Sequence, residues 1–196
     1  MQFFKQAVPL ALIVMVTLSC NEDHSELIPG QDFIPDEILA QIRENGQPIY
    51  EGLNPPDVEG RYLMSPNTLV SSNFDDSSQP GRVFGDNIIT FSEFDSKSLT
   101  MEVDLEQGRT TGTGLGSFIS GEGDNFTIYV RIDRSYESGH TTLEARVFSG
   151  TIRENGILDL YTSLFMVNDG GDPDDELIGN GEGRLFRDRD GFSERY

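Results

Sequence analysis

The chain has 196 residues, of which 34 are acidic and 14 are lysine or arginine, so that its formal net charge at pH 7 is −20. A charge of this size and sign repels phosphate backbones and excludes nucleic acid as a partner. The single cysteine excludes an intrachain disulfide, and the length suits one domain with a hydrophobic core.

Residues 1–19 have the layout of an export signal. Lys5 precedes an apolar run over residues 7–16, and the small residue Ser19 comes directly before Cys20. The run is far shorter than the roughly 20 residues that a membrane-spanning helix needs. We therefore expect residues 1–19 to be a signal peptide.

The cysteine that follows this run resembles the lipobox of bacterial lipoproteins. The resemblance implies that the Cys20 thiol receives a diacylglycerol, that the signal is removed before Cys20, and that the new amino terminus is acylated, for instance with palmitate. An ordinary signal peptide and an uncleaved apolar anchor are the alternatives, with Cys20 incidental in both. Membrane attachment through a lipid is therefore the first partner that we expect.

Residues 20–33 begin CNEDHSE and are expected to form an acidic, flexible tether. Acidic residues directly after a lipidated cysteine resemble the surface-export signal of lipoproteins from Bacteroidetes. The resemblance implies a lipid-anchored protein of the outer membrane that is exposed at the cell surface. The periplasmic face of that membrane is the alternative location.

The segment IPDEILAQIRENG at residues 34–46 predicts a short amphipathic helix. Pro35 suits the first helical turn, and Gly46 ends the helix. Three apolar residues fall on one side, Ile38, Leu39 and Ile42, and they need a surface to pack against.

From Val58 onward the apolar residues recur with a period of two, which predicts β-strands. The expected strands cover residues 60–64, 87–94, 98–105, 111–120, 126–133, 143–148, 158–166 and 178–186. Short turn sequences and no helical stretches separate them, which favours antiparallel hairpins. We predict a mainly β domain over residues 34–196, an antiparallel up-and-down β-barrel of about eight strands with one short N-terminal helix. A β-sandwich is the alternative.

One face of each predicted strand is apolar, and we expect these faces, including Leu143 of the 143–148 strand, to point into the barrel. A small barrel is either filled by side chains or holds one small ligand. The second interpretation predicts an apolar cavity with the 35–45 helix as its lid. Its candidate ligand-binding residues are Phe91, Met101, Val103, Phe126, Ile128, Val130 and Leu160.

The GRYLMSP strand behind a leading helix resembles the lipocalin or calycin plan. The segments NPPDVEGRYLMSP, SGTIRENGILDLYTSLFMVND and GRLFRDRDGFS resemble uncharacterised putative lipoproteins of Bacteroidetes. These resemblances imply a lipocalin-like barrel and an envelope location, and they bring no catalytic residues with them.

The loop NDGGDPDDE offers a group of oxygen ligands that suits calcium. Its candidate metal ligands are Asp169, Asp172 and Asp174. A solvated acidic loop without a metal is the alternative, and the sequence suggests no other cofactor.

No motif in the sequence predicts catalysis. The histidines His24 and His140 are isolated, and no nucleophile elbow is present. The glycines of TGTGLGSF at 111–118 precede an alternating strand, so they predict a bent strand rather than a phosphate-binding loop. We expect a non-enzymatic, membrane-anchored binder of a small apolar ligand. The alternatives are a surface interaction or structural module with an envelope protein partner, and a hydrolase with carboxylate catalysts.

Overall fold

The computed structural model describes residue 34 and residues 36–172 and 176–196. The predicted signal peptide, Cys20, the tether over residues 20–33 and the candidate metal ligand Asp174 lie outside the described residues. What the sequence predicts for them stays a prediction.

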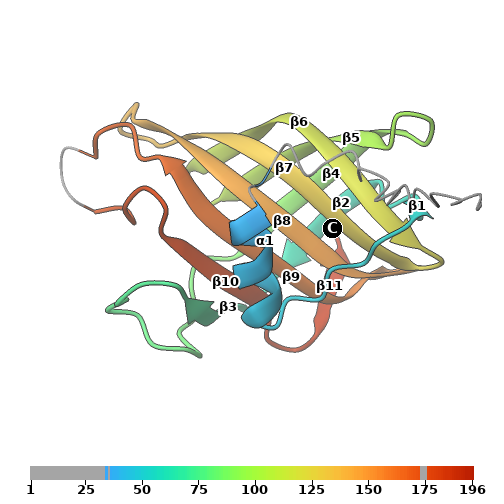
Figure 1. Cartoon of the computed structure of the whole chain (residues 1–196), viewed down its shortest axis with the longest axis horizontal. Coiled ribbons are helices and arrows are strands. Elements are labelled where there is room, and N and C mark those ends of the chain that lie inside the picture. The colour runs from blue at the N-terminus through green and yellow to red at the C-terminus, as the bar shows by residue number, and fades with distance from the viewer. Residues whose placement is uncertain (1–33, 35, 173–175) are drawn as a thin grey trace, which may run out of the picture.

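The described residues form one helix and eleven strands (Figure 1). The helix is α1 (Asp36–Glu44), and the strands are β1 (Leu53–Asn54), β2 (Gly60–Met64), β3 (Asn67–Ser72), β4 (Asn87–Asp95), β5 (Thr100–Gln107), β6 (Thr110–Glu122), β7 (Asn125–Ser135), β8 (Thr141–Arg153), β9 (Gly156–Asn168), β10 (Gly183–Asp188) and β11 (Phe192–Arg195). No helix in the described ranges combines the length and the apolar character that crossing a membrane requires.

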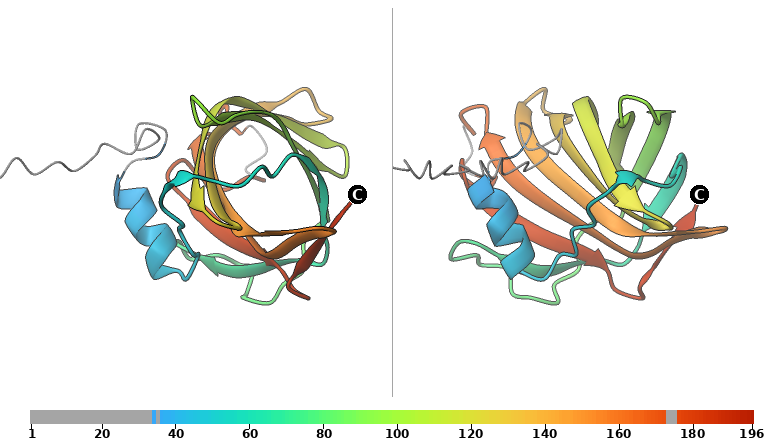
Figure 2. Two further views of the ribbon diagram at one scale, coloured as in Figure 1. Left: turned by 90° about the vertical axis from the view of Figure 1, so that its right-hand side faces the viewer. Right: turned by 45° about the vertical axis from the view of Figure 1, so that its right-hand side comes forward.

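The strands belong to one sheet that closes into a barrel-like ring (Figure 2). Eight strands make the ring in the order β11, β2, β4, β5, β6, β7, β8 and β9, and β11 pairs with β9 to close it. All pairings within the ring are antiparallel, and consecutive strands are neighbours from β4 to β9. The predicted mainly β, up-and-down architecture is confirmed, and one sheet replaces the two that a sandwich needs.

Two positions in the ring are each occupied by a pair of short strands, β2 with β3 and β10 with β11. β10 and β11 share one edge of β9, where β10 pairs with residues 161–165 and β11 with residues 156–158. On their other side, β10 pairs with β3 and β11 with β2. The β2–β3 and β10–β11 segments therefore act as two bent strands that complete the ring together.

Sequence reasoning missed β1, β3 and β11. It also started β10 too early, because the 178–186 prediction includes residues that lie in the connection before Gly183. The other predicted strands lie at their expected places, and β2 has the predicted bounds. The glycine-rich stretch is part of β6, where the pairing register with β7 shifts between Gly114 and Ser117, as expected of a bent strand.

Most of the interior of the ring is packed with apolar side chains. One buried cluster contains side chains from all eight ring strands except β11, together with Val58, Leu69 of β3 and Phe186 of β10. Aromatic rings meet edge to face within it, and the Phe91 and Phe148 centroids lie 5.6 Å apart. Burial of this cluster is the main source of stability for a chain without a disulfide.

A second apolar cluster lies outside the ring, beneath α1. Leu39 and Ile42 of the helix are buried against Phe118, Val147 and Phe165, which lie on the outer faces of β6, β8 and β9. Figure 2 shows α1 beside the ring rather than over either end of it. The predicted amphipathic helix is confirmed, and the expectation that it forms a lid is wrong.

The two faces of β8 are therefore the reverse of what its sequence pattern indicates. Phe148 lies opposite Ile128 of β7 in the interior cluster, which places the alternate residues Glu144 and Arg146 on the same inward face. The apolar Ala145 and Val147 face outward and pack under α1. The helix needs an apolar surface, and β8 provides one at the expense of placing charged side chains inside the ring.

Candidate functional site

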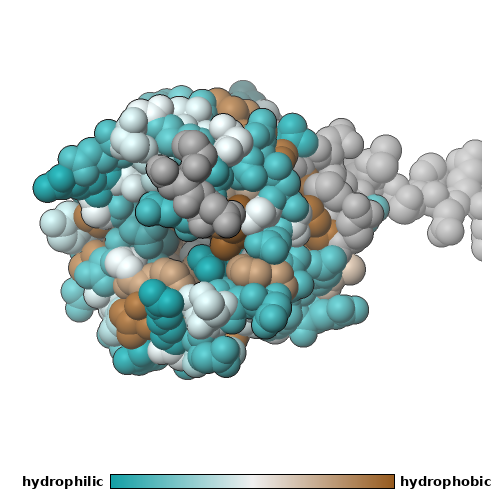
Figure 3. All heavy atoms as spheres, turned by 90° about the vertical axis from the view of Figure 1, so that its left-hand side faces the viewer, coloured by the Kyte–Doolittle hydropathy of each residue, from teal (hydrophilic) through white to brown (hydrophobic). Residues whose placement is uncertain are grey.

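A cavity of about 160 Å³ lies at one end of the ring, which we call the mouth. Its walls come from the ends of β3 to β10 and from the connections β3–β4, β7–β8 and β9–β10. Figure 3 views the molecule from this end, where hydrophilic residues make up most of the face and hydrophobic patches lie between them. The packed cluster fills the remainder of the ring behind the cavity.

Three buried charged side chains form one wall of the cavity. Arg134 of β7 and Arg146 of β8 are 3% and 2% exposed, and Glu144 is 1% exposed. The Arg146 Nε lies 2.7 Å from the Glu144 Oε2, and the Arg134 Nε lies 3.8 Å from the Oε1 of the same carboxylate. Two arginines thus share one glutamate, and the group carries a net charge of +1.

Each arginine also has a nitrogen that no atom of the described residues engages. The Nη1 atoms of Arg134 and Arg146 are buried and have no hydrogen-bond partner among the described residues. A buried donor without an acceptor costs about 1–3 kcal/mol, and more when it is charged. Burial lowers the pKa of the Arg134 guanidinium, and the neighbouring Arg146 lowers it further. Arginine nevertheless keeps its proton in proteins, so both groups remain cations.

A short hydrogen-bond chain fixes the position of Arg134. Its Nη2 donates to the Gln107 Oε1 at 2.9 Å, and the Gln107 Nε2 donates to the Gly85 carbonyl at 2.8 Å. The Asn67 Nδ2 donates to the same carbonyl at 3.1 Å. The Oδ1 atoms of Asn67 and Asn87, which also line the cavity, are buried without a described donor.

Another arginine, Arg184, lies across the cavity, and the carboxylate of Asp76 neutralises its charge. Arg184 of β10 donates from Nε and Nη2 to the two carboxylate oxygens of Asp76, at 2.6 and 3.0 Å. This paired hydrogen bonding holds the pKa of Asp76 well below its usual range. The Arg184 guanidinium also lies 5.4 Å from the centroid of the Phe84 ring, which forms part of the cavity wall.

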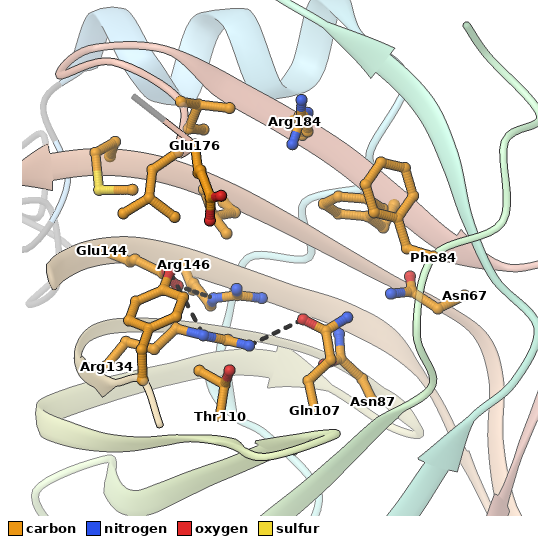
Figure 4. Close-up of a pocket in the computed structure, with 16 residues that line it drawn as sticks. Asn67, Phe84, Asn87, Gln107, Thr110, Arg134, Glu144, Arg146, Glu176 and Arg184 are labelled. Carbon is orange, nitrogen blue, oxygen red and sulfur yellow. Dashed lines mark hydrogen bonds and ion pairs between the residues drawn. The ribbon is translucent and has the colours of Figure 1, made fainter. Parts of the chain in front are cut away.

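The remaining wall is largely apolar. Phe84 and Phe186 meet edge to face with centroids 5.2 Å apart. Further apolar side chains line the cavity from β9 and from the β9–β10 connection, namely Leu164, Met166, Leu177 and Ile178. The cavity therefore joins a cationic wall to an apolar one, and Figure 4 shows Arg134 and Arg146 on one side of it and Phe84 on the other.

An outer groove of about 390 Å³ adjoins the cavity. The two spaces share Tyr136, Glu176 and Leu177, and the groove continues to His140 and Asp172. The His140 Nε2 lies 2.6 Å from the Asp169 carbonyl oxygen, which ties the β7–β8 turn to the β9–β10 connection. The groove provides a solvent-facing approach to the inner cavity.

The structure places the sequence-predicted ligand residues in the packed cluster behind the cavity. All seven are at most 5% exposed and none is among the residues that line the cavity; they are Phe91, Met101, Val103, Phe126, Ile128, Val130 and Leu160. Their ligand-binding role stays a prediction.

The predicted calcium loop is described only in part. The Asp169 Oδ1 accepts a hydrogen bond from the Gly171 backbone N–H, and the Asp172 Oδ2 accepts one from the Leu177 N–H, each at 2.8 Å. Within the described residues, no group of three or more His, Cys, Asp or Glu side chains is arranged to hold a metal ion. Asp174 lies outside these residues, and calcium binding here stays a prediction.

Sequence reasoning missed the cationic wall altogether. Glu144 and Arg146 alternate with apolar residues, and such charges are normally assigned to the solvent face of a strand. The available signal was the leading helix, because its apolar side requires an apolar outer face on some strand of the sheet.

No protein-family model, curated protein or solved structure matches this chain.

Proposed function

We propose that this protein is a non-enzymatic binding protein that holds one small ligand in the mouth cavity. The observation that carries this proposal is the cavity itself, which lies at one end of the ring and contains buried polar atoms that have no partner among the described residues. Ligand sites are typically concave, largely apolar and equipped with a few polar groups that fix orientation. The mouth cavity is concave, combines apolar and polar lining residues, and offers buried polar atoms that can orient a ligand.

The proposed ligand has an apolar body and one polar end. This refines the lipocalin-like carrier of an apolar molecule that the sequence suggests, because the apolar and cationic walls lie side by side in one cavity. The buried carboxylate of the cavity, Glu144, is tied to two arginines. Its proposed role is therefore that of a counterion.

We further propose that a lipid on Cys20 holds the protein at the outer membrane, with the ring exposed at the cell surface. The sequence supports this through the apolar run before Cys20 and the acidic residues after it. The ring and α1 lie within residues 34–196. Residues 21–196 therefore retain every described contact and lack the proposed lipid.

Native mass spectrometry of residues 21–196, exported in the native host behind a cleavable signal peptide and purified from its envelope fraction, tests the binding function. We expect a bound species heavier than the bare chain, and organic extraction should release a small molecule. Leu164→Trp places a large side chain in the cavity. The matched control is Val167→Trp, because Val167 is exposed near the end of β9 and does not line the cavity.

We expect the extra mass to disappear with Leu164→Trp and to persist with Val167→Trp. A bare mass for the wild-type protein, or an extra mass that both variants retain, would contradict binding in this cavity.

A further inference from the structure

We propose that the polar end of the ligand is a single carboxylate that binds between the Nη1 atoms of Arg134 and Arg146. This inference deepens the proposed function and depends on it, because it assigns the chemistry of the ligand that the mouth cavity holds. Glu144 acts as a positioning residue that orients both guanidinium groups.

The charge balance of the wall favours a monoanion. Arg134, Arg146 and Glu144 are all at least 97% buried, and together they carry a net charge of +1 that no other ion pair among the described residues neutralises. Burying an unpaired charge is costly, whereas a ligand with one negative charge neutralises the group. A dianion such as hydrogen phosphate would leave excess negative charge beside the Glu144 carboxylate.

The geometry favours a planar acceptor with two oxygens. The hydrogen bonds and ion pairs within the wall use Nε of both arginines and Nη2 of Arg134, and they leave the two buried Nη1 groups unengaged. Figure 4 shows both guanidinium groups extending away from the Glu144 carboxylate into the space on the side of Gln107 and Asn67. Charge-assisted bonds from arginine to a carboxylate are about twice as strong as neutral ones.

The other charged groups of the cavity do not compete for this anion. Arg184 is already engaged by both oxygens of Asp76. Glu176 lies at the exposed rim, where the cavity joins the outer groove. Its negative charge favours entry of the ligand with the carboxylate directed inward, toward the arginine pair.

The rest of the cavity defines the body of the ligand. A volume of about 160 Å³ is close to that of cavities of roughly 150 Å³ that accept benzene, so the body is about the size of one ring. The Oδ1 of Asn67 is buried, has no donor among the described residues, and belongs to a side chain on the opposite side of the cavity from Glu144 (Figure 4). This acceptor favours a hydroxyl or N–H donor at the far end of the ligand.

Benzoate and benzamide provide a direct test, because they have nearly the same shape and differ in charge. Isothermal titration calorimetry of residues 21–196 with benzoate should give a dissociation constant at least about tenfold lower than with benzamide, from the added strength of charge-assisted bonds. Phosphate should bind more weakly than benzoate. 4-Hydroxybenzoate should bind more tightly than benzoate.

Arg134→Gln is the variant of choice, because it leaves the neutral 2.7 Å pair of Arg146 and Glu144 in place. It should raise the dissociation constant for benzoate about tenfold or more and leave that for benzamide nearly unchanged. Arg146→Gln should act in the same direction. The matched control is Arg61→Gln, whose ion pair with Glu106 is exposed and lies outside the cavity lining.

The outcomes separate this inference from the proposed function. Equal affinity for benzoate and benzamide, or benzoate binding that Arg134→Gln leaves unchanged, overturns the carboxylate assignment and retains a binding cavity. Failure of every probe to bind, together with a bare mass for the host-derived protein, overturns both. Loss of benzoate affinity in Arg61→Gln as well would also overturn the assignment, because it would place the anion elsewhere.

Discussion

Arg146 and Glu144, two residues apart on β8, form a 2.7 Å ion pair inside the ring, on a strand whose other face is apolar and lies beneath α1. The same carboxylate serves Arg134 of β7. One glutamate thus orders two buried cations at the mouth of a largely apolar interior.

Glu144→Gln should destabilise the protein strongly, because it leaves two buried guanidinium groups without their counterion. Breaking a buried ion pair from one side costs about 3–5 kcal/mol. The control is Glu106→Gln, which removes an exposed pair with Arg61 and should cost less than about 1 kcal/mol. Urea unfolding of the two variants measures the difference, and equal losses would contradict the role given to Glu144.

Ile42→Ala should lower stability without changing ligand affinity. Ile42 is 1% exposed and packs in the cluster outside the ring, and truncation of such a side chain costs about 2–5 kcal/mol. Glu44→Ala, on the exposed end of α1, is the matched control. Urea unfolding gives the stability of each, and titration with benzoate gives the affinity. A higher dissociation constant for benzoate in folded Ile42→Ala would contradict this prediction and would indicate that the helix acts as a lid.

Much of the fold follows from the alternation of apolar residues and from the turn sequences. The hairpins from β4 to β9 lie where the period of two ends, and α1 lies between Pro35 and Gly46. The closure of the ring was harder to predict, because β3 and β11 are short segments that continue bent strands and carry little pattern of their own.

The binding site was not predictable from the same pattern, because alternation gives the two faces of a strand but not which one is interior. On β7, Ile128, Val130 and Ile132 face the interior, as their pattern indicates. On β8 the helix covers the apolar face, and the charged face turns inward. A local sequence pattern does not show which face of a strand packs against the rest of the protein.

Gly112→Ala should destabilise the ring, because the interior at this position is already filled. A Cβ on Gly112 would lie 2.6 Å from the Ile132 Cγ2, and overpacking of this kind costs about 1–3 kcal/mol. A Cβ on Gly179 would have no neighbour closer than 3.5 Å, so Gly179→Ala is the control. Thermal unfolding compares the two, and an unchanged midpoint for Gly112→Ala would show unoccupied space at this position.

Asp188 should make stability depend on pH in the mildly acidic range, between about pH 4 and pH 6. Burial raises the pKa of its carboxyl to about 6, and the neighbouring Asp190 adds to the rise, although the Ser193 hydroxyl donates to it and lowers the pKa. Because the pKa is higher in the folded state than in the unfolded state, protonation of Asp188 favours the folded state. This contribution to the free energy of unfolding is fully present below about pH 4, and it is lost as the pH rises through about 6.

Asp188→Asn removes this titration while keeping an oxygen that accepts from the Ser65 N–H and the Ser193 hydroxyl. Between pH 4.5 and pH 8, the wild-type protein should lose stability relative to the variant, by on the order of 1–3 kcal/mol. Urea unfolding of both proteins at each pH measures this change. A constant difference in unfolding free energy across this range would contradict the assignment.

The most direct test of the whole account is a high-resolution crystal structure of residues 21–196 with 4-hydroxybenzoate. We predict the carboxylate between Arg134 and Arg146, with an oxygen within about 3 Å of each Nη1 and the hydroxyl directed toward the Asn67 Oδ1. A mouth cavity that contains only ordered water at both Nη1 atoms, with the acid bound elsewhere or not at all, would contradict it.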